Sequence, residues 1–147
     1  MSAEGWSAAP KNDAATSSAA AQIARVAADF VDLLAWQRAV GLVREVMRLA
    51  PQVRGPGAAD TVDQLMSAAE SVAANIAEGY GRCGGREFAR FLRIAAASAA
   101  ETESHLRVAE ACGRLPSDAV AAVLAHCRDV RALVNGLRKA VQAKGAD

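Results

Sequence analysis

Apolar residues recur every three or four positions over most of the 147-residue chain, which is the spacing of one face of an α-helix. Four stretches carry this pattern, and none shows the strict alternation of a half-buried β-strand. The faces expected to point inward are, in chain order, Leu33, Trp36, Val40, Val43, Met47 and Ala50; Val62, Leu65, Ala69, Val72 and Ile76; Phe88, Phe91, Ala95, Ser98, Thr102, Leu106 and Ala109; and Val120, Val123, Cys127, Val130, Val134, Leu137 and Val141. The chain is therefore predicted to form four amphipathic helices.

Capping and helix-breaking residues set the expected limits of the first two helices. Asp32 stands just before the first apolar pattern and is a plausible N-cap, because its side chain can accept a hydrogen bond from a free amide of the first turn. The segment 51–57, PQVRGPG, is expected to end this helix. The second helix is expected to end at Gly79, because glycine readily adopts the left-handed conformation that closes many helices.

The third helix is expected to begin near Arg86 and to run to Ala111 or Cys112. A turn follows, and Ser117 is a good N-cap for the fourth helix. The pair 135–136, Asn-Gly, is typical of hairpin turns, but it lies inside an unbroken helical pattern, so we expect the helix to continue through it.

Short connections favour antiparallel neighbours, so we predict an all-α fold, an up-down-up-down antiparallel four-helix bundle over residues 29–147. Residues 1–28 are rich in alanine and serine and are expected to form a flexible N-terminal tail. Alanine accounts for 37 of the 147 residues, and each alanine buries little apolar area. We therefore expect closely packed helices and further burial between subunits.

Charge and composition exclude several classes of protein. The 17 Lys and Arg residues nearly balance the 16 Asp and Glu residues, which is not the pattern of a chain that coats nucleic acid. No apolar run approaches the roughly 18–20 residues of a membrane span, and the N-terminus lacks the basic and apolar regions of a signal peptide. Cys83, Cys112 and Cys127 form no Cys-x-x-Cys pair, which favours reduced thiols. These features predict a cytoplasmic protein without membrane association.

The segment 75–82, NIAEGYGR, combines polar, glycine and aromatic residues that invite a functional interpretation. A phosphate-binding loop is not favoured, because such loops follow a strand and carry a different glycine and lysine spacing. Asn75 and Glu78 lie one helical turn apart beside Ile76. A catalytic role would need a second carboxylate or a histidine, whereas hydrogen bonding within the fold or between subunits needs only one polar partner. We favour the structural role.

Arg82, Arg86, Arg90 and Arg93 are spaced 4-4-3 and form a basic stripe at the start of the third helix. Such a stripe can contact the phosphates of a nucleic acid or an acidic partner. Ion pairing with side chains such as Glu87 is the alternative that we favour, because the chain is nearly neutral and few aromatic residues accompany the stripe.

Glu101, His105, His126 and Cys127 are candidate metal ligands, because an antiparallel pair of helices turning near Leu115 would place His105 opposite His126. The paired Glu-x-x-His motif of di-iron bundles is absent, however. Plain packing residues are therefore the preferred interpretation, and no metal or other cofactor is expected.

Four segments resemble a bacterial four-helix-bundle family that was first named for reading frames inside large-subunit rRNA intervening sequences. They are DLLAWQRAVGLVREV, QLMSAAESVAANIAEGYGR, EFARFLRIAAASAAETESHL and VNGL, and the resemblance spans roughly Asp29 to Leu137. Its most specific part is the segment 75–82 followed by Glu87, Phe88, Phe91, Leu92, Ile94 and Ala95.

The resemblance implies a four-helix subunit that commonly assembles as a ring-like homopentamer and, for most of the family, no known catalysis. It also reaches the accessory variability determinant of diversity-generating retroelements, a basic pentamer that works with a reverse transcriptase and RNA. The chain departs from the family pattern at 66–67, where a basic pair is usual, and at Ala73, where proline is frequent. No Lys or Arg occurs from Gly55 to Gly81, which argues against RNA binding through the second helix.

The leading hypothesis is a non-enzymatic, homo-oligomeric helical scaffold, expected to be a pentamer, that presents a surface to a protein or protein–RNA partner. One alternative is a nucleic-acid-binding accessory subunit of a reverse transcriptase, and another is a metal-binding bundle. The residues assigned to the structural family motif are Asn75, Glu78, Gly79, Tyr80 and Gly81, and those assigned to partner contact are Arg82, Arg86, Arg90 and Arg93.

Overall fold

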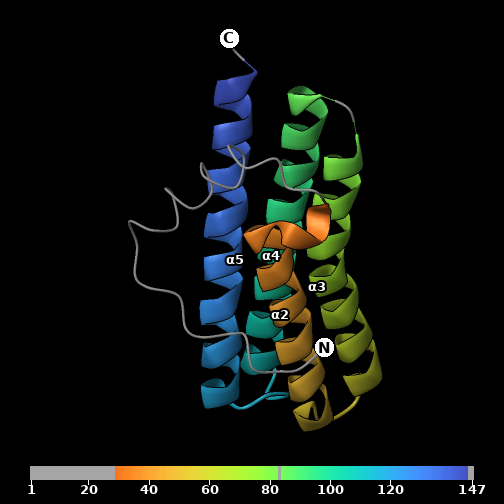
Figure 1. The fold of residues 1–147 in the computed structure, drawn as a ribbon. Helices are drawn as coiled ribbons and strands as arrows, with labels where there is room; N and C mark the ends of the chain where they lie inside the picture. The colour runs from red at the N-terminus through yellow and green to blue at the C-terminus, as the bar shows by residue number, and fades with distance from the viewer. Residues whose placement is uncertain (1–28, 83, 146–147) are drawn as a thin grey trace.

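The computed structural model describes residues 29–82 and 84–145, and these residues form an antiparallel bundle of four α-helices (Figure 1). The helices are α2 (Leu34–Leu49), α3 (Ala58–Gly81), α4 (Gly85–Ala111) and α5 (Ser117–Lys144). Two short 3₁₀-helices, η2 (Phe30–Asp32) and η3 (Ala50–Gln52), flank α2. No strand occurs among the described residues, so the predicted all-α fold is confirmed. The predicted tail, 1–28, lies outside the described part of the chain.

Each helix packs against two neighbours: α3 and α5 both contact α2 and α4, which leaves α2 and α4 diagonally opposite each other. Because the chain alternates in direction, the start of α4 and the end of α5 lie at the same end of the bundle, at the top of Figure 1. The helix α2 has 16 residues and α5 has 28, so α2 accompanies only part of the length of the longer helices.

The core confirms most of the predicted faces. All seven predicted positions of α5 are buried, from Val120 to Val141, and the helix runs unbroken through Asn135 and Gly136. In α3 and α4 the predicted faces are also inside, with Phe88 and Phe91 only half-buried at the start of α4. The largest side chains with almost no exposed surface are Leu42, Leu65, Ile76, Leu92, Leu106 and Leu137.

The predicted inward face of α2 is wrong from Trp36 onward, whereas Leu33, which precedes the helix, is buried as predicted. Its buried residues are Ala35, Ala39, Gly41, Leu42, Val46 and Leu49, one position away from the predicted stripe. Trp36 and Val43 pack only partly against the core, and Met47 is 57% exposed. Two apolar stripes lie side by side on this helix, and the small alanines allow α2 to approach its neighbours along one of them. The larger side chains of the other stripe are left at the edge of the core.

Three predicted helix boundaries are also corrected. Asp32 does not cap α2; it belongs to η2, where it forms a reciprocal capping box with Asp29. Ser117 is the first residue of α5 rather than its N-cap, a position held by Pro116. The helix α3 does not end at Gly79 but continues to Gly81, and the left-handed backbone lies instead at Gly84, with φ +112°.

Gly79 has a packing role. It is buried, and a Cβ atom placed on it would lie 2.6 Å from Cβ of Phe91 and 3.0 Å from a ring carbon of Phe88. The backbone of α3 therefore contacts the first turns of α4 directly. The glycine is required by a neighbouring helix and not by the end of its own helix.

We predict that Gly79→Ala lowers the free energy of unfolding by about 1–3 kcal/mol, because the added methyl group forces α3 and α4 apart. Urea denaturation followed by circular dichroism measures the change. The matched control is Gly81→Ala, which has no atom within 4 Å of the added Cβ and is expected to leave stability unchanged or raise it by up to about 1 kcal/mol. Equal effects of the two substitutions would contradict the packing role of Gly79.

Candidate functional site

Asn75 lies in a line of polar groups between α3 and α4. Its side-chain amide donates to the backbone oxygen of Ser71 at 2.8 Å and to the Ser71 hydroxyl at 3.1 Å. The Ser71 hydroxyl in turn lies 2.9 Å from the hydroxyl of Ser98 on α4. Thr102, which is fully buried, donates to the backbone oxygen of Ser98 at 2.9 Å. These small polar side chains satisfy one another, so the two helices approach closely without leaving a buried group unpaired.

The other residues of the family motif surround the turn between α3 and α4. Glu78 is exposed rather than near the core, and one of its carboxylate oxygens accepts hydrogen bonds from Nε and Nη2 of Arg82, at 2.9 and 2.6 Å. The Tyr80 ring packs edge-on against Phe88, with centroids 6.0 Å apart. Gly81, the last residue of α3, is exposed. The geometry around Glu78 is that of a surface ion pair.

The predicted arginine stripe divides into two groups that face different neighbours. Arg82 and Arg90 lie over the ring of Phe91, with guanidinium carbons 5.3 and 5.4 Å from its centroid. Arg90 also pairs with Glu87 at 3.7 Å. These two arginines are thus engaged with α3 and the first turns of α4.

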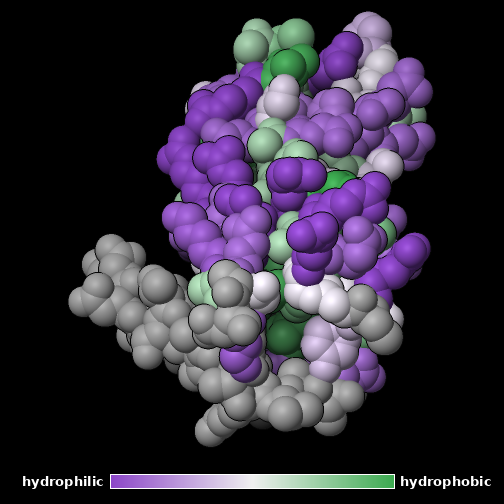
Figure 2. All heavy atoms as spheres, turned by 90° about the horizontal axis from the view of Figure 1, so that it is seen from above, coloured by the Kyte–Doolittle hydropathy of each residue, from purple (hydrophilic) through white to green (hydrophobic). Residues whose placement is uncertain are grey.

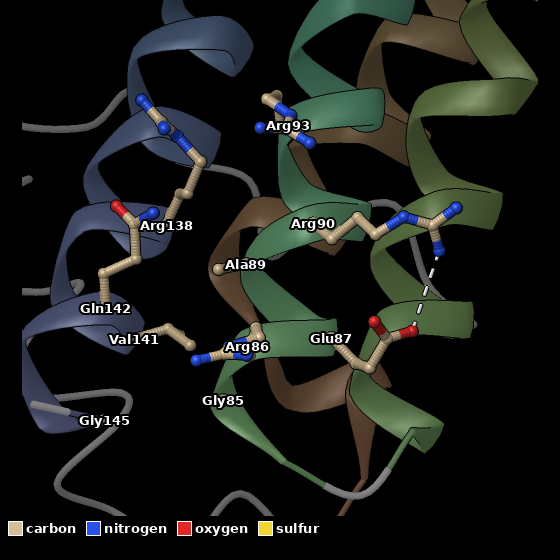
Figure 3. A pocket seen from close by; sticks show the side chains of 10 residues that line it. All are labelled: Gly85, Arg86, Glu87, Ala89, Arg90, Arg93, Arg138, Val141, Gln142 and Gly145. Carbon is tan, nitrogen blue, oxygen red and sulfur yellow. Dashed lines mark ion pairs between the residues drawn. The ribbon is translucent and has the colours of Figure 1, made fainter.

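Arg86 and Arg93 instead line a cavity between the start of α4 and the end of α5, with a volume of about 400 Å³. In Figure 3, Arg86 reaches across toward Val141 on α5, whereas Arg90 turns to the other side and meets Glu87. The walls and floor of the cavity consist of Gly85, Arg86, Glu87, Ala89, Arg90, Arg93, Arg138, Val141, Gln142 and Gly145. We call it the arginine pocket.

Arg138, from α5, contributes a buried donor to the arginine pocket. Its Nε atom is buried and has no hydrogen-bond partner among the described residues. Within the same part of the chain, neither Arg86 nor Arg93 forms an ion pair with an acidic side chain. The pocket therefore holds positive charge that no acidic side chain in the described part of the chain neutralises.

The whole end of the bundle around the pocket is basic. It carries Arg82, Arg86, Arg90, Arg93, Arg138, Lys139 and Lys144, which we call the basic end. Figure 2 looks onto this end and shows hydrophilic residues over much of its surface, with hydrophobic residues in breaks between them and at the upper edge of the view. These seven basic side chains outnumber the two carboxylates of Glu78 and Glu87 at this end.

At the opposite half of α4 and α5, three arginines share one carboxylate. Glu103 accepts hydrogen bonds from Arg107 at 2.8 and 3.0 Å and lies 3.7 Å from Arg131 and 4.0 Å from Arg128. The hydrogen bond from Arg107, with the nearby positive charges, lowers the pKa of Glu103 below its ordinary value. One carboxylate therefore serves three arginines in this cluster, which makes it a weaker candidate for contact with an anion.

The chemistry available in the arginine pocket is that of binding. Arginine stays protonated in proteins and cannot act as a general base. Among residues 29–82 and 84–145, the lining contains no histidine, cysteine, serine, threonine, tyrosine or lysine, and the carboxylate of Glu87 is turned toward Arg90. The pocket thus offers several hydrogen-bond donors for an anion and no nucleophile.

The candidate metal ligands are placed apart. His105 lies 3.5 Å from Glu101 on its own helix and lines a shallow hollow with Asp60 and Gln64 of α3. His126 instead lies 3.2 Å from the backbone oxygen of Arg38 on α2. No cluster of three or more His, Cys, Asp or Glu side chains suited to a metal occurs in residues 29–82 and 84–145.

The sequence identified only the α4 side of the arginine pocket. Arg138 and Gln142 belong to α5, which is distant in the chain from the start of α4. Nothing in the local pattern of α5 identifies these two residues as part of a pocket. The antiparallel order of the helices was the available signal, because it brings the start of α4 beside the end of α5.

The reactivity of Cys127 tests whether this residue is buried in the core of the bundle. Desolvation by burial, and secondarily the charge of Glu103, raises the pKa of its thiol from 9.0 to about 12, whereas Cys112 is exposed. In a Cys83→Ser background at pH 8, we predict that a thiol reagent labels Cys112 quickly and Cys127 only when the protein is unfolded. Raising the pH to 10 should still not label folded Cys127. Because the pKa of Cys127 is higher in the folded than in the unfolded protein, the protonated thiol contributes to stability below pH 9. This contribution is lost as the pH rises toward 12. Equal labelling of both thiols in the folded protein would contradict this.

Comparison with known proteins identifies the family of this chain. No described helix is long and apolar enough to cross a membrane. A search of curated proteins gave no match. The family model described as 23S rRNA-intervening sequence protein matches residues 31–136, which include all of α2, α3 and α4 and most of α5. The resemblance noted in the sequence is thereby confirmed, and the chain belongs to the 23S rRNA-intervening sequence protein family.

Proposed function

We propose that this protein is a non-enzymatic, homo-oligomeric helical scaffold that presents its basic end to a protein or protein–RNA partner. The main observation in support of a homo-oligomer is the position of two exposed apolar side chains. Met47 on α2 is 57% exposed and Val108 on α4 is 52% exposed, and α2 and α4 lie diagonally across the bundle. One subunit thus has apolar surface on two opposite sides.

Each of these side chains has apolar or small neighbours. Half-buried Val40 and Val43 lie along the same stripe of α2 as Met47. On α4, Ile94 is 37% exposed and lies 14 residues before Val108, which places both on one face of the helix. Exposed apolar side chains that recur along one helix face are typical of surfaces that another chain covers.

The two surfaces also lie at a similar height. The helices α2 and α4 run in the same direction, and Met47 and Val108 are both near their C-terminal ends. A contact between the α2 surface of one copy and the α4 surface of the next is heterologous, so repetition of it generates a closed ring when the rotation closes. This supports the ring-like assembly, with a pentamer as the form expected from the family resemblance.

Substitution of either apolar side chain tests the ring. Wild-type protein is expected to be a defined oligomer by light scattering, whereas Met47→Glu and Val108→Glu are each expected to be monomeric, because each lacks one half of the contact. An equimolar mixture of the two variants retains one intact half of each kind and is expected to form a dimer of twice the monomer mass. Ala121→Glu, at an exposed position of α5, is the control and should assemble as wild type.

A monomeric wild type would remove the ring. Assembly of the Met47→Glu or Val108→Glu variant by itself would show that the residue is outside the interface. Two monomeric variants whose mixture stays monomeric would indicate an isologous contact, in which like surfaces meet.

The second candidate function is a nucleic-acid-binding accessory subunit of a reverse transcriptase, which is favoured by the uncompensated arginines of the basic end. Binding of RNA through phosphates should weaken steeply with salt. We expect the double substitution of Arg86 and Arg93 to Gln to reduce RNA affinity more than the same double substitution of Arg82 and Arg90. The latter two arginines already contact Phe91 and acidic side chains. Undetectable RNA binding at low salt would exclude this function for the isolated protein.

A further inference from the structure

We propose that the arginine pocket binds a phosphate monoester, carried by a free nucleotide or by the end of a nucleic-acid strand. The inference rests on the proposed use of the basic end as a contact surface, but it does not depend on the oligomeric state. It is carried by three observations: uncompensated charge, a buried donor without a partner and the free amides of a helix start.

The first observation is the charge inside the cavity. Four arginines and one glutamate line it, and Arg90 pairs with Glu87 at 3.7 Å. The remaining three, Arg86, Arg93 and Arg138, have no acidic partner among the described residues. Arginine is the side chain that recognises phosphate through paired, planar hydrogen bonds. Three such groups around one cavity supply more positive charge than a phosphate dianion needs for neutralisation.

The second observation is the orphaned donor. Nε of Arg138 is buried without a hydrogen-bond partner, although an unpaired buried donor is unfavourable in a folded protein. Arg138 lines the cavity together with Gln142, which lies one turn further along α5. Because Nε has almost no accessible surface, a bound acceptor becomes its partner only when the Arg138 side chain turns further into the cavity, whereas the rest of the side chain already lines it.

The third observation is the start of α4 in the cavity wall. The N-cap is Gly84, which has no side chain to cap the helix, and the first helical hydrogen bond is the one from the Phe88 amide to the Gly84 oxygen. The amides of Gly85, Arg86 and Glu87 therefore have no partner within the helix, and all three residues line the cavity. Free amides and the dipole of a 27-residue helix favour an anion at this place.

The size of the cavity limits the ligand. About 400 Å³ lies within the range of small-molecule sites and accommodates a phosphate with part of its ester group. Ala89 and Val141 supply apolar floor beside the charged walls. A terminal phosphate can enter such a cavity, whereas the internal phosphates of a duplex can contact only its rim.

A structural role for the same arginines is the competing explanation. The last turn of α5 also borders the cavity, and basic side chains near a helix C-terminus stabilise its carbonyl groups. In that case substitution of Arg138 would lower the stability of the free protein, and phosphate would have no specific effect. The two explanations therefore differ in what an added ligand does.

The experiment is isothermal titration of the full chain at constant ionic strength with pyrophosphate, with a nucleoside monophosphate and with a short oligoribonucleotide that carries either a 5′-phosphate or a 5′-hydroxyl. We expect the nucleoside monophosphate or the 5′-phosphorylated oligonucleotide to bind wild type, and Arg138→Gln and Arg86→Gln each to weaken that binding at least tenfold; binding of pyrophosphate alone would overturn the proposal. The matched control is Lys139→Gln, which removes one charge beside Arg138 but outside the cavity and should change affinity less than twofold. Arg86 is exposed, so its variant keeps the test valid if Arg138→Gln does not fold.

If the 5′-phosphorylated oligonucleotide binds at least tenfold more tightly than its 5′-hydroxyl form, the bound phosphate comes from the end of a nucleic-acid strand. If only the monophosphate binds, the phosphate comes from a free nucleotide. No binding of any probe, or equal losses in the Arg138 and Lys139 variants, would overturn the proposal. Light scattering on the same samples separates this result from the ring, because Arg86→Gln and Arg138→Gln leave Met47 and Val108 intact and should not change the assembly.

Discussion

The direct contact between the backbone of α3 at Gly79 and the first turns of α4 determines much of the rest of this structure. Only a residue without a Cβ atom allows Phe88 and Phe91 to lie so close to α3. The serine pair at 71 and 98 continues the close approach further along the two helices. Because α3 and α4 are fixed against each other here, the turn between them needs few residues, and the start of α4 is held at a defined place.

The position of the start of α4 determines where the arginines gather. The start of α4 lies beside the end of α5, so arginines that are far apart in the chain meet in one cavity. The Phe91 ring contacts Arg82 and Arg90, and Arg90 lines the cavity together with Arg86 and Arg93. A chain with a net charge of +1 can in this way have a strongly basic end. Glu103 contacts three arginines, whereas Nε of Arg138 has no partner in the part of the chain that the structure describes.

The abundance of alanine links the interior to the surface. Ala35 and Ala39 bring α2 close to its neighbours, but each buries little apolar area. Burial stabilises the fold by roughly 25 cal/mol for each Å², so each alanine contributes little. Leu42 and Leu49 share the buried stripe with these alanines, whereas Trp36 and Met47, on the other stripe of α2, are left at the edge of the bundle or in solvent. A thin core and an exposed apolar edge thus have the same origin, and both favour the burial of further surface between subunits.

The sequence by itself determined the number of helices, their approximate limits and the family, because helical periodicity and helix-breaking residues are local properties of the chain. It also placed the buried stripe of α5 correctly, because valine and leucine there form a single unambiguous face. Tertiary structure alone decided which of two adjacent stripes of α2 turns inward and that Gly79 continues its helix. It also decided that Arg138 joins Arg86 and Arg93 in one cavity. These outcomes depend on the shape and charge of a neighbouring helix, which the local pattern of one segment does not contain.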